Sequence, residues 1–416
     1  MSGPASTRWR HQALGWVAVV AVAGPVGSAS ALAIAPASAV AKAPAPALAV
    51  APAPPPPRTP NPVADPAVAR STLGGTELAR TDVAQGPGTA PLPGDGTAAS
   101  WLVADSVSGT VLAARDAHGR YPPASVLKVL TAVTLIPRLD KAATYVVTPA
   151  DAAVDGSRVG LEPGTAYSIQ DLFTALLSVS GNDAAMALAS AAGGLDPTLA
   201  AMTATARELQ ADDTVVRTPS GLDAPGQVTS AYDLALLGRA GLAIPDFAAY
   251  VAAPVATFLG RDGTRFHIDN HNRLLTRYPG AIGVKNGYTA AARASLVAAA
   301  RRGDHGVIVT LLGAESDLWD EAARLLDWGF DAESRAAAGV GTLVAPRLAG
   351  ALDSADRAAA DTGVAGRPAA APAPVRAATP GLRRPQPVTV VGTVAAITAI
   401  AGATVVLVRR RRARPG

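Results

Sequence analysis

The sequence predicts an α+β fold, a mixed α/β arrangement in which an antiparallel sheet is flanked by helices and interrupted by an inserted helical subdomain. Three observations predict it. Two apolar runs, at residues 101–104 and 110–114, have the composition of strands and are joined by a turn. A block of helix-forming segments follows, and further strand-like segments come after that block. Strands from both ends of one domain, residues 99–334, are therefore expected to form a single sheet.

The helical block begins after two prolines, where residues 125–138 are predicted to form a helix. Residues 169–192 contain helical runs that break at Gly181, and residues 229–241 are predicted to form a further helix. Three strands and a closing helix are expected after this block, at residues 281–287, 295–300, 306–312 and 317–328. The predicted order of elements is strands, helices, strands and a last helix.

The composition outside this domain is typical of linkers. The 416 residues include 40 Gly and 35 Pro, and only 4 % of the side chains are aromatic. Residues 42–98 and 335–387 are rich in Ala and Pro and are predicted to be semi-extended spacers. The absence of cysteine excludes a disulfide framework, thiolate catalysis and a cysteine-ligated metal.

Both ends of the chain carry an apolar segment beside positive charge. Residues 1–41 are predicted to be a secretory signal peptide, because Arg8 and Arg10 precede a long uncharged stretch. Residues 388–408 have no charged side chain and are long enough to form a transmembrane helix. Arginines follow at once in the tail 409–416, which is predicted to be cytoplasmic. The expected protein is a single-pass protein of the cell membrane with an extracytoplasmic domain.

The charge of the body argues against nucleic-acid binding. The formal net charge is +4, but two arginines near the N-terminus and five in the C-terminal tail contribute seven positive charges. Without those seven, the remaining residues carry a net charge of −3. A nucleic-acid-binding domain would be expected to be basic.

Lysine is rare in this chain and marks two candidate sites. Only four of the 36 basic Lys and Arg residues are lysines. A lysine that must lose its proton cannot be replaced by arginine. Lys128 lies three positions after Ser125, so the two side chains share one face of a helix. A serine in a first helical turn lies where backbone N–H groups can stabilise an oxyanion, and a lysine with a lowered pKa can take its proton.

Two other short segments carry polar groups in suitable places. Ser180-Gly181-Asn182 lies at the predicted break between helices, where its hydroxyl and amide can face one cleft. Lys285-Asn286-Gly287 ends an apolar strand, and a glycine at a strand edge lets a substrate backbone lie alongside it. Taken singly, the first segment is better explained as an ordinary polar turn between helices, and the second is also compatible with a solvated lysine in an Asn-Gly turn.

Together, the Ser-x-x-Lys, Ser-x-Asn and Lys-x-Gly segments resemble the serine-type D-Ala-D-Ala carboxypeptidases, the low-molecular-mass penicillin-binding proteins of the DD-peptidase/β-lactamase superfamily. The resemblance extends to PPASVLKVLT at 122–131, SIQDLFTALLSVSGNDAA at 168–185, TPSGLD at 218–223, NHNRLL at 270–275, GVKNGYT at 283–289 and LLDWGF at 325–330. One position departs from the family pattern, because Asn286 stands where the family usually has Thr. Asn can still donate a hydrogen bond.

The resemblance implies a catalytic role for four residues. Ser125 is the expected nucleophile, which the carbonyl of the penultimate D-Ala acylates, and Lys128 is the expected general base. Ser180 is expected to relay a proton to the leaving D-Ala amine. Asn182 is expected to orient Lys128 and the substrate amide.

The resemblance also implies how the substrate is held. Lys285, assisted by Asn286, is expected to bind the terminal carboxylate. Gly287 and Tyr288 complete the substrate-binding strand, and the backbone N–H groups of Ser125 and Tyr288 are expected to form the oxyanion hole. The implied substrates are peptidoglycan stem peptides ending in D-Ala-D-Ala, and β-lactams are the implied covalent inhibitors. No cofactor and no metal is expected.

Two groups of alternatives remain open at this stage. The same acyl-serine site could serve a D,D-endopeptidase, a transpeptidase or a β-lactamase. A class A β-lactamase uses a glutamate after the second motif to activate water, and Glu208 is the only glutamate between residues 183 and 314. A catalytically silent wall-binding module is the other alternative, and Asn286 is its only support. His267 and His271 have a spacing that can bind metal on a helix, but their segment does not have a helical pattern.

Overall fold

The computed structural model describes residues 70–94, 96–260, 263–315 and 318–347. The predicted signal peptide at 1–41, the membrane segment at 388–408 and the basic tail at 409–416 lie outside these described residues.

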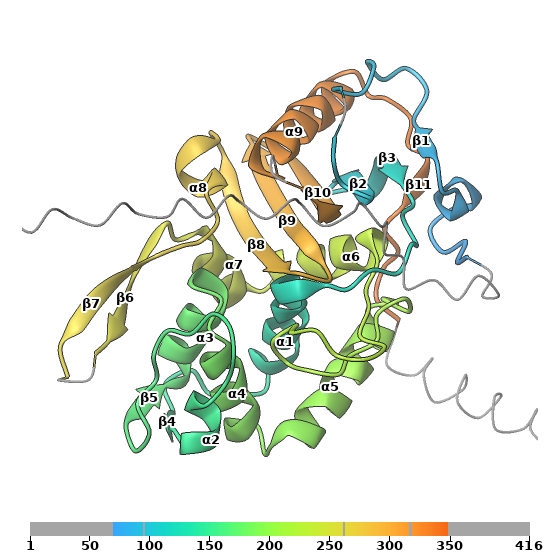
Figure 1. The fold of residues 1–416 in the computed structure, drawn as a ribbon. Helices are drawn as coiled ribbons and strands as arrows, with labels where there is room; N and C mark the ends of the chain where they lie inside the picture. Colours follow the sequence, from blue (N-terminus) through green and yellow to red (C-terminus); the bar gives the residue numbers. More distant parts are fainter. Residues whose placement is uncertain (1–69, 95, 261–262, 316–317, 348–416) are drawn as a thin grey trace, which may run out of the picture. The chain divides into compact units, whose positions relative to one another are not determined.

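A seven-stranded antiparallel sheet forms the centre of the domain (Figure 1). Its order is β1-β3-β2-β10-β9-β8, with β11 also paired to β3. The five long strands are β2 (Ser100–Asp105), β3 (Thr110–Arg115), β8 (Ala281–Thr289), β9 (Arg293–Arg302) and β10 (His305–Ala314). Strand β2 pairs with β10, with Val103 opposite Val309, so strands from both ends of the domain meet as predicted. The antiparallel sheet with a helical insertion is confirmed.

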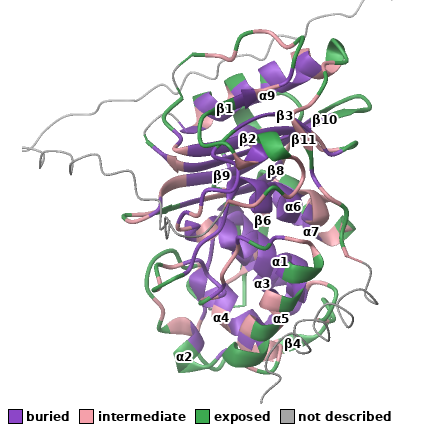
Figure 2. Ribbon diagram, turned by 90° about the vertical axis from the view of Figure 1, so that its right-hand side faces the viewer, coloured by how far each residue is buried: buried purple, intermediate pink, exposed green. Residues whose placement is uncertain are grey.

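Helices cover both faces of this sheet, because successive side chains point to opposite faces and those on both faces are apolar. Val307 and Val309 of β10 pack on one side with helix α9 (Leu318–Ser334). Ile308, between them, packs on the other side with helix α6 (Ala231–Leu242). Figure 2 shows the resulting layers, with α9 on one face of a buried sheet and α6 and α1 on the other.

The inserted subdomain lies on the α6 side of the sheet. It contains α3 (Ile169–Ser178), α4 (Asn182–Ala191), α5 (Leu195–Glu208) and α7 (Pro245–Ala252). Ser168 caps α3 by accepting a hydrogen bond from the Asp171 backbone N–H. The sequence analysis did not anticipate several short elements of this region: β4 (Thr144–Val146), α2 (Pro149–Ala152), β5 (Ala166–Ser168), β6 (Val255–Leu259), β7 (Arg265–Asp269) and α8 (Leu274–Arg277). Helix α7 was not anticipated either, whereas the segment around Glu208 has the sequence of an ordinary helix and forms the end of α5.

The folded domain is larger than the predicted range 99–334. Strand β1 (Val83–Gln85) comes from the predicted first linker, and β11 (Gly341–Thr342) comes from the predicted second linker. Both pair with the same edge of β3, at opposite ends of that strand. An open strand edge needs backbone partners, and Ala/Pro-rich composition does not prevent two short segments from supplying them.

The helix predicted at 125–138 also begins differently. Residues Ala124–Leu127 form a 3₁₀ turn, η2, and α1 extends over Lys128–Leu135. The turn enters through Ala124, whose φ of 51° is incompatible with an α-helix. The nucleophile candidate Ser125 therefore lies in the tight turn before the regular helix.

Within the described residues, no single helix has the length and apolar composition needed to cross a membrane. Helices α6 and α7 meet that test only as a pair bent by 105°.

Candidate active site

Ser125 lies where the sheet edge meets the helical subdomain. Turn η2 packs against β8 and β9, and Ser125 is partly accessible to solvent. The strained conformation of Ala124 is held by close packing, because a Cβ added to Gly221 would lie 1.9 Å from the Ala124 carbonyl oxygen. Gly221, at a φ of 82°, thus allows the loop after α5 to press on the turn that carries Ser125.

Lys128 connects the first two predicted motifs. Its Nζ lies 2.9 Å from Ser125 Oγ, 2.7 Å from Asn182 Oδ1 and 2.6 Å from the Ser220 carbonyl oxygen. The amide oxygen and the carbonyl oxygen can each accept one N–H of a neutral amine. The lone pair of that amine is then left for the Ser125 hydroxyl proton. This geometry is that of a general base and its nucleophile.

The surroundings of Lys128 favour its neutral form. The side chain is fully buried, and burial lowers its pKa well below the usual value for lysine. The positive charge of Lys285 lowers the Lys128 pKa further, whereas the Asp183 carboxylate opposes the shift. A neutral Lys128 can accept a proton, which an ordinary lysine at neutral pH cannot do.

The loop over residues 155–161 is held by the first two residues of α4. Asn182 Nδ2 donates to the Asp155 carbonyl oxygen at 2.6 Å. The Asp183 carboxylate accepts hydrogen bonds from the backbone N–H groups of Val159, Gly160 and Leu161. The sequence analysis singled out Asn182 for the site and expected Asp183 only to cap a helix, whereas the structure shows its carboxylate bonded to this loop. Asp183 fixes the loop that in turn fixes the Asn182 amide beside Lys128.

Ser180 lies in the turn between α3 and α4 with a φ of 63°. Its hydroxyl is buried and has no hydrogen-bond partner within the described ranges. A buried hydroxyl without a partner is uncommon in folded proteins and is compatible with a group that bonds a ligand. The structure therefore brings Ser180 to the same interhelical break as Asn182, but it does not bond Ser180 to Ser125 or Lys128.

The third predicted motif lies on β8, beside Ser125. Lys285 is buried, and its Nζ donates to the carbonyl oxygen of its neighbour Asn286 at 2.7 Å. Burial lowers the pKa of Lys285 to about 7. A Cβ on Gly287 would lie 2.5 Å from the Ser125 backbone N, so only glycine permits this approach. Tyr288, the next residue of β8, is 70 % exposed.

Two groups near the site carried no clear signal in the sequence. The Ser220 carbonyl is a backbone atom, so only the resemblance of TPSGLD at 218–223 pointed to that loop. Burial lowers the pKa of His271, and the charge of nearby Lys285 lowers it further. The sequence analysis considered His271 only with His267 as a metal pair.

Among the residues that the structure places, no group of three His, Cys, Asp or Glu side chains could hold a metal ion. Glu208 ends α5 and is exposed.

The two buried lysines predict a bell-shaped pH dependence of kcat/KM. Lys128 must be neutral to accept a proton, so activity falls as the pH drops below its lowered pKa. If Lys285 binds a carboxylate, as the resemblance implies, it must be charged, so activity falls as the pH rises through its pKa of about 7. A bound carboxylate raises the Lys285 pKa, so the basic limb of kcat is expected at higher pH than that of kcat/KM. Steady-state rates across the pH range check this, and basic limbs of kcat and kcat/KM that coincide would contradict it.

Comparison with known proteins agrees with this geometry. Residues 87–316 match the peptidase S11 family, described as D-alanyl-D-alanine carboxypeptidase. The chain is 45 % identical over 262 residues to the D-alanyl-D-alanine carboxypeptidase DacB2 of Mycobacterium tuberculosis, covering 61 % of this chain and 89 % of that protein. It is 36 % identical over 249 residues to DacC of Escherichia coli, covering 56 % of this chain and 61 % of that relative's length.

Solved structures give the same result. A crystal structure of a D-alanyl-D-alanine carboxypeptidase from Mycobacterium tuberculosis matches with a TM-score of 0.59 and 44 % identity, covering 62 % of this chain and 99 % of that one. The Streptomyces K15 DD-transpeptidase matches with a TM-score of 0.55 and 26 % identity. The match covers 58 % of this chain and 99 % of the transpeptidase chain. The chain therefore belongs to the S11 peptidases, the family of serine-type D-alanyl-D-alanine carboxypeptidases.

Proposed function

We propose that this protein removes the terminal D-Ala from peptidoglycan stem peptides through an acyl-serine intermediate on Ser125. One observation carries the proposal. Lys128 Nζ is buried between two oxygen acceptors and lies 2.9 Å from Ser125 Oγ, with its pKa lowered by that burial. A base and a nucleophile in contact at a sheet edge are the parts that acyl transfer needs.

The first half of the reaction forms the acyl-enzyme. Lys128 takes the Ser125 hydroxyl proton while Oγ attacks the carbonyl carbon of the penultimate D-Ala. The backbone N–H groups of Ser125 and Tyr288 stabilise the oxyanion that develops on that carbonyl. The C–N bond then breaks, and the departing D-Ala amine receives the proton through the Ser180 hydroxyl. The acyl group stays on Ser125.

The second half releases the acyl group. Water attacks the ester carbonyl and gives its proton to Lys128. The ester bond then breaks, the Ser125 hydroxyl regains a proton, and the shortened peptide leaves as a carboxylic acid.

During the first half, Lys285 holds the terminal carboxylate as a charged partner, with Asn286 donating a further hydrogen bond. Once D-Ala has left, this contact no longer holds the peptide. β-Lactams are proposed to acylate the same serine.

The full-length protein, incubated with a peptide ending in D-Ala-D-Ala, is expected to release free D-Ala. An added amino acceptor tests the second candidate function, transpeptidation, which is favoured by the similarity to the Streptomyces K15 DD-transpeptidase. Carboxypeptidase activity predicts that D-Ala release greatly exceeds the formation of a peptide joined to the acceptor. A transfer product equal to the released D-Ala would favour transpeptidation instead.

We also propose that the C-terminal segment anchors the protein, with the catalytic domain outside the cytoplasm. The support is the uncharged run at 388–408 followed by arginines at 409–412 and 414. A chain that lacks residues 388–416 is expected to move from the membrane fraction to the soluble extracytoplasmic fraction, which includes the growth medium. Deletion of residues 409–416 alone, which keeps the apolar run, serves as the control. Membrane recovery of the longer deletion would contradict the proposal.

A further inference from the structure

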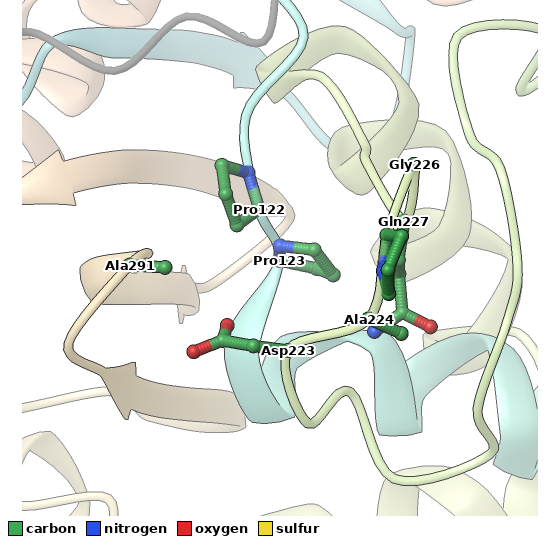
Figure 3. A pocket seen from close by; sticks show the side chains of 8 residues that line it. Pro122, Pro123, Asp223, Ala224, Gly226, Gln227 and Ala291 are labelled. Atoms are coloured by element: carbon green, nitrogen blue, oxygen red, sulfur yellow. The ribbon is translucent and has the colours of Figure 1, made fainter.

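Two pockets of the described domain lie near opposite ends of β8. One, of about 340 Å³, lies beside Pro122 and Pro123, which lead to Ser125, and belongs to the active-site region (Figure 3). The other, of about 520 Å³, lies near the first residues of β8 on the α6 side of the sheet. The proposed mechanism assigns no function to this second pocket. We call it the distal pocket, and its lining includes Arg239, Ala248, Ile282 and Arg301.

The distal pocket is separate from the reacting groups but touches the same strand. Ile282, in its wall, lies five residues before Gly287 on β8, which is roughly 16 Å along an extended strand. A bulge between Ala281 and Gly283 leaves Ile282 outside the regular pairing with β9. An occupant of the pocket would therefore contact the strand that carries Lys285, at a distance from the nucleophile.

Small and apolar side chains form most of the wall. Ala248 and Ala252 lie one turn apart on the same face of α7, so two methyl groups stand where larger side chains would fill the space. A pocket of this volume with a mainly apolar lining is typical of sites for small molecules. The other apolar members of the wall are Val107, Leu242, Ala243 and Ile282.

Arg239 gives the distal pocket a fixed positive charge. Its guanidinium, near the end of α6, donates to the carbonyl oxygens of Ser106 at 3.0 Å, Val107 at 2.8 Å and Leu343 at 3.4 Å. These bonds hold the group in place and use three of its five N–H donors. Among the residues that the structure describes, no carboxylate forms an ion pair with Arg239, so its charge is not neutralised.

Arg301 is the freer of the two arginines. Successive side chains of β9 point to opposite faces of the sheet. Arg302 faces α9, where it forms an ion pair with Asp327 at 2.7 Å. Arg301 therefore faces the α6 side, where it is exposed and lines the pocket. In the described part of the chain its side chain forms no ion pair and no hydrogen bond, so its planar N–H groups can bind a carboxylate with two bonds.

The acids near the pocket do not supply the missing partner. The Asp105 carboxylate accepts hydrogen bonds from the backbone N–H groups of Val107 and Ser108 and from the Ser108 hydroxyl, so it is used within its own turn. The C-terminal end of α6 lies in the wall at Leu242 and Ala243, and its carbonyl groups offset part of the positive charge. The remaining charge matches a single carboxylate better than a dianion.

We propose that the distal pocket binds a small soluble molecule that joins one carboxylate to an apolar body. Arg301 binds the carboxylate, and Arg239 adds positive potential while it keeps its bonds to the backbone. The alanine face of α7 receives the apolar body. Binding is modest in strength, because the charge of the exposed Arg301 is screened by water. The inference does not depend on the proposed function, because the site lies away from Ser125.

Two probes and two pairs of variants test this inference. The full-length protein is held in discs of phosphatidylcholine bilayer, and the binding of 4-phenylbutyrate is measured by saturation-transfer NMR. 4-Phenylbutanol, which has the same apolar body without the charge, is the matched neutral probe. Arg301→Gln removes the charge, and Arg324→Gln, at an exposed position of α9 across the sheet, is its control. Ala248→Leu fills the pocket, and Ala249→Leu, at the next and exposed residue of α7, is its control.

The two probes are expected to respond differently to the loss of charge. The dissociation constant of 4-phenylbutyrate is expected to rise about three- to fivefold in Arg301→Gln, the range of an exposed ion pair. That of 4-phenylbutanol, higher than the 4-phenylbutyrate constant by a similar factor in the wild type, is expected to stay unchanged in this variant. Ala248→Leu is expected to weaken the binding of both probes at least tenfold, because leucine occupies their space. Both control variants are expected to keep the wild-type constants.

Three outcomes would overturn the inference. The first is that a folded wild-type protein binds neither probe. The second is that Ala248→Leu leaves the binding of 4-phenylbutyrate unchanged, which would place the probe elsewhere, such as at Lys285. The third is that phosphatidylglycerol in the discs displaces the uncharged probe as well as the charged one, which would assign the pocket to membrane lipid. D-Ala release is measured separately, so a failure of the proposed function would leave these constants unaffected.

Discussion

Replacing Ser125 with alanine is expected to abolish the release of D-Ala from a D-Ala-D-Ala peptide. The loss expected in kcat is on the order of 10⁴-fold or more, because no other group can take over the covalent step. The fold should be retained, since the side chain is small, lies in the turn η2 and is partly exposed. Free D-Ala is measured at equal concentrations of folded protein.

The matched control for this variant is Ser108→Ala. Ser108 lies in the exposed turn between β2 and β3, where its hydroxyl bonds Asp105 and Thr110 and, among the described residues, no other group. Its removal should leave D-Ala release at the wild-type rate. A Ser125→Ala protein that still turns over within tenfold of the wild type would show that Ser125 is not the nucleophile.

Replacing Lys128 with arginine is expected to lower kcat by about 10²- to 10⁴-fold, the range of a lost general base. Arginine keeps a positive charge but cannot give up a proton in a protein. It would also place a permanent charge among Ser125, Asn182 and the Ser220 carbonyl, where burial now favours a neutral amine. The rate of D-Ala release is compared with that of Lys128→Met, which fills similar space without a charge.

Both Lys128 variants are expected to lose activity to a similar extent, because neither side chain can take the Ser125 proton. Unfolding measurements on both variants show whether a lower stability contributes to that loss. Lys128→Met should lose about 1–3 kcal/mol of stability, because it leaves the buried Asn182 Oδ1 and Ser220 carbonyl oxygen without their donor. Lys141→Arg is the control, since Lys141 forms an exposed ion pair with Asp246 that arginine can also make. A Lys128→Arg protein with nearly normal activity would contradict the role of Lys128 as base.

The sheet was the more predictable part of the fold. Continuous apolar runs such as 101–104 and 306–312 become strands that are buried on both faces, and their composition alone indicates strands. Strands β1 and β11 were missed because they are only three and two residues long and lie in Ala/Pro-rich sequence. Their pairing depends on the free edge of β3, which is a tertiary property that local composition does not encode.

The site was predictable to the extent that it rests on side-chain chemistry. The rarity of lysine drew attention to Lys128 and Lys285, and the structure places both in buried positions with lowered pKa values. The Ser220 carbonyl and the 159–161 backbone could not be predicted in this way. Any residue type has a carbonyl and an N–H, so their positions follow from the loop conformation that Gly221 and Asp183 allow.

The most direct test of the account is to trap the acyl-enzyme and find the modified residue. The full-length protein is incubated with benzylpenicillin and is then digested for mass spectrometry. When the β-lactam ring opens, its amine stays attached to the acyl group, so no leaving group diffuses away. The account predicts one adduct per chain, on the peptide that contains Ser125, and none in Ser125→Ala. An adduct on a different residue, or D-Ala release that continues after benzylpenicillin has modified every molecule, would contradict it.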